Sequence, residues 1–205
     1  MSMTTKEKAF LSIFCLLAWS GVFLQLYLSI ATSLENDKTL IHGVIMYTGY
    51  FTVLTNIFID VLVTLRVTGV STNNSVRGCA TTAILLVGIV YHFVLKDIWE
   101  PTGAQWLADV MLHYVTPILS LIYWIAYPPA NKVSITELFK WLLYPLAYLL
   151  YVLIRGEIVN LYPYPFIDLM VLEGAQVFVN SLGISLSFIV IGTAVTLLAN
   201  WRRNS

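Results

Sequence analysis

The chain has 205 residues, of which 59% are apolar and only 11% are charged, and its mean hydropathy is +0.81. A soluble domain is about 45–50% apolar and about 25% charged, so this composition excludes an ordinary soluble globular protein. Eleven basic residues balance eleven acidic ones, and no basic surface for nucleic acid is expected. The composition predicts one all-α, polytopic membrane domain over residues 1–205.

Six apolar segments are long enough to cross a bilayer, which takes about 20 residues. In chain order, we expect transmembrane helices over 9–31, 41–65, 79–95, 106–127, 138–154 and 175–199. The first is too long for the apolar part of a signal peptide, so we interpret it as a retained helix. The loop over 156–174 contains Leu161-Tyr162-Pro163-Tyr164-Pro165-Phe166. This segment predicts either an interfacial lid or re-entrant segment, or an ordinary aromatic-belt loop.

Basic residues gather on one side of these predicted helices. The N-terminus, the second and fourth loops and the C-terminus hold eight of the eleven Lys and Arg residues. The other three loops carry seven acidic residues. The positive-inside rule then predicts that both termini are cytoplasmic, which an even number of spans also requires.

Polar residues within the helices recur at three- and four-residue steps, which places them on single helical faces. These stripes are Thr48, Thr52, Thr55, Asn56 and Asp60; Asp109, His113, Pro117 and Ser120; Tyr144, Tyr148, Tyr151 and Arg155; Gln176, Asn180 and Ser187; and His92 with Lys96. Ionisable groups inside a membrane are costly and mark functional sites. The competing interpretation is structural, because membrane hydroxyls often bond to the carbonyl one turn back.

Two of these residues, Thr52 and His113, are predicted to lie at a similar depth in the bilayer. Thr52 lies about 11 residues into its helix, roughly 16 Å, and His113 about 7 residues, roughly 10 Å, both counted from the non-cytoplasmic side. Asp109 precedes His113 by one turn, and a carboxylate beside an imidazole orients it and makes it more basic. This is the arrangement of a general base. The three histidines are scattered singly, so neither a metal site nor a cofactor is predicted.

Three segments carry a resemblance to a known family. Gly49-Tyr50-Phe51-Thr52-Val53-Leu54-Thr55-Asn56 and the later Leu112-His113-Tyr114-Val115-Thr116-Pro117 resemble motifs of the androgen-induced membrane protein family. Tyr162-Pro163-Tyr164-Pro165-Phe166, followed by Asp168, is similar to a motif of its small bacterial relatives. The family includes the androgen-dependent regulator of tissue factor pathway inhibitor, and its animal members are multi-span threonine hydrolases. The resemblance implies an integral protein of the bacterial cytoplasmic membrane.

The same resemblance implies roles for individual residues. Thr52 matches the nucleophile, with Thr55 as the fallback, and His113 matches its partner. The interval from His113 to Pro117 is one residue shorter than in the family pattern. The implied partners are membrane lipids, and the implied substrates are fatty acid esters of hydroxy fatty acids.

We therefore expect an intramembrane lipid-ester hydrolase in which His113 deprotonates Thr52 and Asp109 orients His113. Candidates for contacts with the substrate or the oxyanion are Asn56, His92, Lys96, Tyr148, Tyr151, Arg155 and Asn180. Two alternatives remain at this point. Intramembrane Asp, His and Lys also form the relays of a proton-coupled small-molecule or lipid transporter, and the same pocket would suit a non-catalytic lipid-binding protein.

Overall fold

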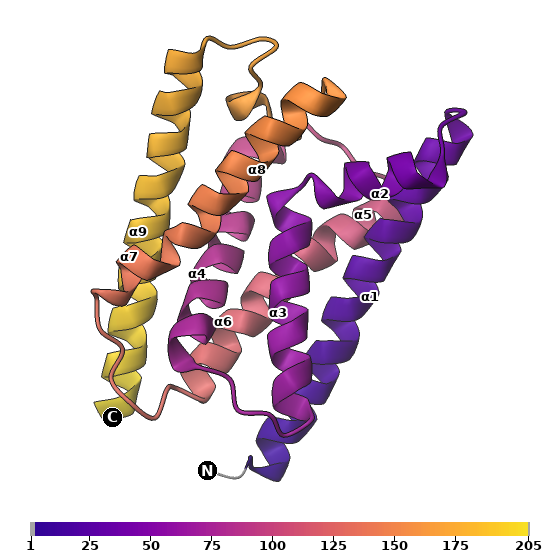
Figure 1. Ribbon diagram of the computed structural model, residues 1–205. Coiled ribbons are helices and arrows are strands. Elements are labelled where there is room, and N and C mark those ends of the chain that lie inside the picture. The colour runs from indigo at the N-terminus through magenta and orange to yellow at the C-terminus, as the bar shows by residue number, and fades with distance from the viewer. Residues whose placement is uncertain (1–2, 205) are drawn as a thin grey trace.

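The computed structural model describes residues 3–204 (Figure 1). The protein is 79% helical, and residues 3–204 contain no strand. The helices of this described part that are long and apolar enough to cross a membrane are Thr5–Glu35, Asn74–Leu95, Gly103–Ala126, Glu137–Val159 and Gly174–Arg203. A sixth span results if the bent pair Leu40–Thr48 and Phe51–Val67 is counted as one. The predicted class, an all-helical multi-pass membrane protein, is confirmed.

The predicted spans correspond to the following helices. The first and last are α1 (Thr5–Glu35) and α9 (Gly174–Asn204), and the third is α4 (Asn74–Val90) followed by the π-helical turn η1 (Tyr91–Leu95). The fourth consists of α5 (Gly103–Val110), the π-helical turn η2 (Met111–Val115) and α6 (Thr116–Ala126), and the fifth of α7 (Glu137–Trp141) and α8 (Leu143–Val159). In Figure 1, α1 begins and α9 ends at the same end of the bundle.

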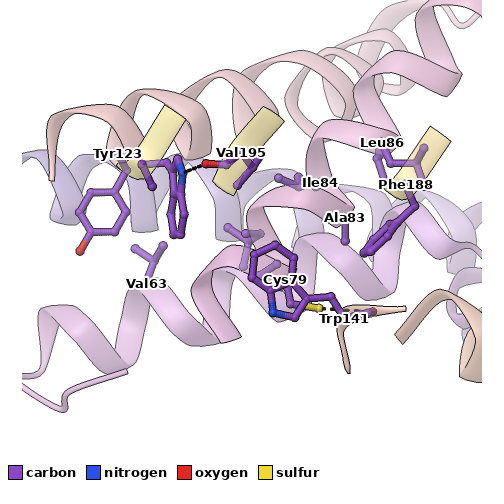
Figure 2. Close-up of a cluster of buried hydrophobic side chains, with 14 of the residues drawn as sticks. Val63, Cys79, Ala83, Ile84, Leu86, Tyr123, Trp141, Phe188 and Val195 are labelled. Atoms are coloured by element: carbon purple, nitrogen blue, oxygen red, sulfur yellow. Dashed lines mark hydrogen bonds between the residues drawn. The ribbon is translucent and has the colours of Figure 1, made fainter. Parts of the chain in front are cut away.

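Helix α4 lies at the centre of the bundle, where it packs against α3 (Phe51–Val67), α6, α7 and α9. Small residues let the neighbouring helices come close to α4: Ala80 and Ala83 lie in these contacts and are fully buried. At Gly78, an added Cβ would lie 2.5 Å from the ring of Trp141 in α7. Figure 2 shows this cluster, in which Trp141 lies beside Cys79 and Phe188 of α9 packs on the same helix. Close packing of this kind drives helix association where lipid removes the hydrophobic driving force.

The helix predicted over 41–65 is broken, which corrects the expectation of one continuous span. Helices α2 (Leu40–Thr48) and α3 (Phe51–Val67) meet at 82°, with Tyr50 in an extended conformation between them. Such a break leaves the last carbonyls of α2 without their usual amide donors. In a membrane these carbonyls must find other partners within the protein.

Side chains of α8 supply these partners. The hydroxyl of Tyr148 donates to the Gly49 carbonyl (2.8 Å), and that of Tyr151 donates to the Thr48 carbonyl (3.2 Å). The buried guanidinium of Arg155 donates twice to the carbonyl of residue 45 (2.9 and 3.3 Å). The polar stripe on this helix therefore stabilises the break.

The loop between α8 and α9 folds back onto the helices. Asn160 ends α8 in the left-handed conformation (φ 52°), and the chain then returns through the 3-10 turn η3 (Pro165–Ile167). Asn180 of α9 donates to the carbonyl of Phe166 (2.9 Å), and Arg155 donates to the carbonyl of Leu161 (3.1 Å). Both ends of the Tyr-Pro-Tyr-Pro-Phe segment are thus tied to membrane helices.

Candidate functional site

Thr52 lies at the buried N-terminus of α3, directly after the break. It is the second residue of that helix, so its backbone N–H has no acceptor within the helix. The N–H donates instead to the hydroxyl of Tyr164 in the α8–α9 loop (3.3 Å). The positive end of the helix dipole favours negative charge at this place. The break therefore positions a hydroxyl where an anion would be stabilised.

The structure brings Thr52, His113 and Asp109 together. Thr52 Oγ1 lies 3.4 Å from His113 Nε2, across 61 residues of sequence. On the other side of the ring, His113 Nδ1 lies 3.0 Å from the Asp109 carbonyl oxygen and 3.2 Å from its Oδ1. Both Asp109 atoms are acceptors, so the hydrogen-bond network assigns the ring proton to Nδ1 and leaves Nε2 free to accept from Thr52.

Two π-helical turns face each other at this histidine. His113 lies in η2 and Tyr91 in η1, and their rings stack with centroids 3.9 Å apart and planes 14° apart. The helices approach closely here, because a Cβ added at Gly88 would lie 3.0 Å from the His113 carbonyl oxygen. Wide helical turns of this type occur frequently at functional sites. The stacking restricts the imidazole to one orientation.

Tyr164 completes a chain of polar contacts. Its hydroxyl lies 3.4 Å from Thr52 Oγ1, in addition to accepting the Thr52 N–H. Burial raises the pKa of Tyr164 to about 12, so its hydroxyl keeps its proton at neutral pH and can donate to Thr52 Oγ1. Sequence reasoning did not single out this residue. The available signal was its position between Pro163 and Pro165 in the loop motif.

Asn56 connects the two halves of the site. It is fully buried, and its amide nitrogen donates to the carbonyl of Thr52 (2.8 Å) and to that of Leu112 in η2 (3.2 Å). Both amide protons are therefore engaged. Asn56 therefore fixes α3 relative to η2, and its expected part in stabilising an oxyanion stays a prediction.

Other expected contacts also have different partners. The Thr55 hydroxyl is fully buried and lies 3.0 Å from the hydroxyl of Tyr144, so Thr52 is the threonine that meets the histidine. His92 Nδ1 lies 3.2 Å from the hydroxyl of Tyr114. Lys96 is exposed just after η1.

The remaining candidates for contacts with the oxyanion or the substrate donate hydrogen bonds to backbone carbonyl groups. Tyr148, Tyr151 and Arg155 donate to carbonyls of the α2–α3 break. Asn180 donates to the carbonyl of Phe166. These bonds hold the break and the loop in place, and direct contact of the four side chains with the substrate stays a prediction.

A cavity of about 80 Å³ opens beside Thr52. Thr52, Tyr164 and Ser181 line it, and the buried Ser181 Oγ has no hydrogen-bond partner among the described residues. The rest of the wall is mainly apolar and includes Leu86, Val87, Val90, Leu149, Ile167 and Ile184. Leu146 of α8 also lines the cavity and is 47% exposed, so the cavity extends to the outer surface of the bundle.

Within residues 3–204, no group of three or more His, Cys, Asp or Glu side chains is arranged to hold a metal ion. No family model, curated protein or solved structure matches the chain.

Proposed function

We propose that this protein is an intramembrane hydrolase of carboxylic esters with long apolar chains. The observation that carries the proposal is the contact series Tyr164–Thr52–His113–Asp109, of which Tyr164 and Thr52 line an apolar cavity. A nucleophile, a base within reach and a group that orients the base are the three parts that acyl transfer requires.

In the first half of the reaction, His113 Nε2 takes the proton of the Thr52 hydroxyl as Oγ1 attacks the ester carbonyl carbon. Asp109 accepts a hydrogen bond from Nδ1–H of the imidazolium, which keeps that proton, and stabilises its charge. The tetrahedral intermediate then breaks its bond to the alcohol oxygen, which leaves with the proton from Nε2. An acyl-Thr52 ester remains.

In the second half, water takes the place of the alcohol. His113 Nε2 removes a proton from this water, and the hydroxyl attacks the acyl carbon. The bond to Thr52 Oγ1 breaks, Oγ1 regains the proton from Nε2, and the carboxylic acid leaves. One ester and one water become one acid and one alcohol.

Negative charge on the carbonyl oxygen needs donors that are already in place. The Tyr164 hydroxyl and the Thr52 N–H lie 3.3 Å apart on one side of the nucleophile. A carbonyl oxygen that enters beside Tyr164 would replace the Tyr164 hydroxyl as the acceptor of the Thr52 N–H and also accept from that hydroxyl, and the α3 dipole adds to their effect. Tyr164 is therefore assigned as a catalytic residue.

The proposed membrane arrangement counts the bent pair α2–α3 as the second of six spans. Both termini then lie in the cytoplasm of a bacterial cell, as the distribution of basic residues favours, and Thr52 lies in the outer half of the inner membrane. The apolar substrate enters laterally from the lipid through the cavity bordered by α8 and α9. The resemblance to the androgen-induced family supports fatty acid esters of hydroxy fatty acids, or another lipid ester, as substrates.

The test is labelling of the purified protein by a fluorophosphonate probe, together with hydrolysis of long-chain nitrophenyl esters. We expect Thr52→Val and His113→Ala each to lower the rate of labelling and the rate of ester hydrolysis by about 10²–10⁴-fold. Thr55→Val is the matched control, because it removes a neighbouring buried hydroxyl that bonds Tyr144, and it keeps the activity. Thermal unfolding checks that the wild type and both variants are folded. Equal labelling of all three then refutes the assignment of Thr52 and His113 as catalytic residues.

A further inference from the structure

A buried carboxyl group on α3 has no role in the chemistry above. Asp60 is 0% exposed, and neither of its carboxylate oxygens has a hydrogen-bond partner among residues 3–204. One turn before it, the Oδ1 atom of the fully buried Asn56 also has no partner in the described chain. Two acceptor groups on one helical face are thus left without donors.

An ionised Asp60 would be expensive at this place. Removing a carboxylate from water costs several kcal/mol unless a cation or several donors compensate. A neutral carboxylic acid avoids most of this cost. It also carries an O–H, which needs an acceptor nearby.

Asn56 offers that acceptor. Its nitrogen is identified without ambiguity, because Nδ2 faces the two carbonyl oxygens of Thr52 and Leu112, which leaves Oδ1 as the acceptor. Side chains of a helix lean toward its N-terminus, and residues four apart are neighbours. The Asp60 side chain therefore leans toward Asn56.

Many ionisable groups on the helices around α3 have partners of their own. These pairs are Glu7 with Arg66, Cys15 with Thr64, Tyr47 with the Val22 carbonyl, Arg77 with the Tyr127 carbonyl, Cys79 with the Trp141 carbonyl, His113 with Asp109, Tyr144 with Thr55, and Arg155 with the Ile45 carbonyl. Arg66 is the cation closest along α3, six residues or about 9 Å beyond Asp60, and it is bound by Glu7.

We propose that Asp60 is a proton-binding site: it holds a proton at neutral pH and donates it to Asn56 Oδ1. This bond keeps the Asn56 amide in the orientation in which it links Thr52 to Leu112. Loss of the proton would place a carboxylate against Oδ1 and turn the amide, which breaks its bonds of 2.8 and 3.2 Å. Asp60 is thus a positioning residue for the Thr52–His113 contact, and its protonation does not depend on what that contact catalyses.

The test is infrared spectroscopy of the purified protein at neutral pH, in H2O and D2O. We expect a C=O stretching band of a protonated carboxyl that is absent in Asp60→Asn and displaced in Asp60→Glu. Asp109→Asn is the control and retains the band, because Asp109 faces His113 as an acceptor. Carboxyl-13C aspartate should displace the band in the wild type itself, so the result does not require any variant to fold.

A wild-type spectrum without a protonated aspartate band overturns the proposal, and so does a band that survives Asp60→Asn. A second measurement separates this site from the proposed hydrolase. Asp60→Asn should unfold at nearly the wild-type temperature, because an amide donates to Asn56 Oδ1 as the acid does, whereas Asp60→Leu should unfold at a lower temperature. Both results hold even if no ester is ever hydrolysed.

Discussion

Arg155 offers the sharpest test of how the broken helix is held. Its guanidinium is buried, with 7% exposed, and it donates to the Ile45 carbonyl at 2.9 and 3.3 Å and to the Leu161 carbonyl at 3.1 Å. One side chain therefore ties the end of α2 to the loop that carries Tyr164. Substitution Arg155→Met keeps most of the apolar stem and removes every donor.

The expected loss of stability follows from these contacts. A hydrogen bond from a charged donor contributes about 1.5–3 kcal/mol, and a buried carbonyl left unpaired costs about 1–3 kcal/mol. The Leu161 carbonyl loses the Arg155 donor and the Ile45 carbonyl keeps the 3.3 Å bond from the Thr48 hydroxyl, while methionine avoids the cost of burying a charge. We expect Arg155→Met to lower the free energy of unfolding by about 3–5 kcal/mol. Tyr151→Phe removes one neutral bond from the same break and should cost about 1 kcal/mol.

Thermal unfolding in detergent and hydrogen exchange by mass spectrometry measure both effects. Exchange should accelerate in two separate peptides of Arg155→Met, one covering residues 45–50 and the other residues 160–166. It should accelerate only in the first in Tyr151→Phe. If Arg155→Met is as stable as Tyr151→Phe and leaves the second peptide protected, Arg155 does not couple the break to the loop, and the reasoning is wrong.

Two further predictions concern the histidine and the loop. Gly88→Ala should slow probe labelling of Thr52, because the new Cβ would lie 3.0 Å from the His113 carbonyl oxygen; Gly183→Ala, which has open space, should leave it unchanged. Labelling reduced equally in both variants would contradict this close approach. The pKa of Tyr164 rises from 10.0 to about 12 on folding, so its contribution to stability is complete below pH 10 and lost toward pH 12. Between these pH values, the free energy of chemical unfolding should decline more steeply for the wild type than for Tyr164→Phe. Identical slopes would show that folding does not raise the pKa of Tyr164.

Much of the fold was predictable because it depends on periodic, local patterns. Hydrophobic length identified the membrane segments, and three- and four-residue steps placed Tyr148, Tyr151 and Arg155 on one face of a helix. The same steps, combined with depth along each helix, predicted Thr52 and His113 at one level. What these side chains bond to was not predictable, since the carbonyls they serve become free only where α2 and α3 separate.

The break itself shows why. Gly49 leaves room for the Arg155 guanidinium beside the break, but a glycine within an apolar segment is equally compatible with a continuous helix. A Cβ at Gly49 would lie 2.7 Å from Arg155 Cζ. The interaction joins residues 106 positions apart, so no local pattern contains it.

The sequence by itself determined that this chain is a helical multi-pass membrane protein, and it singled out a threonine and a histidine with an acid one turn away. Only the tertiary structure placed Thr52 at a helix N-terminus, brought Tyr164 to it from a distant loop, and left Asp60 and Asn56 Oδ1 without a donor among residues 3–204. The physical reason is that composition and periodicity report how each helix meets its surroundings. Hydrogen-bond partners depend on how separate segments pack, and that is decided only when the bundle closes.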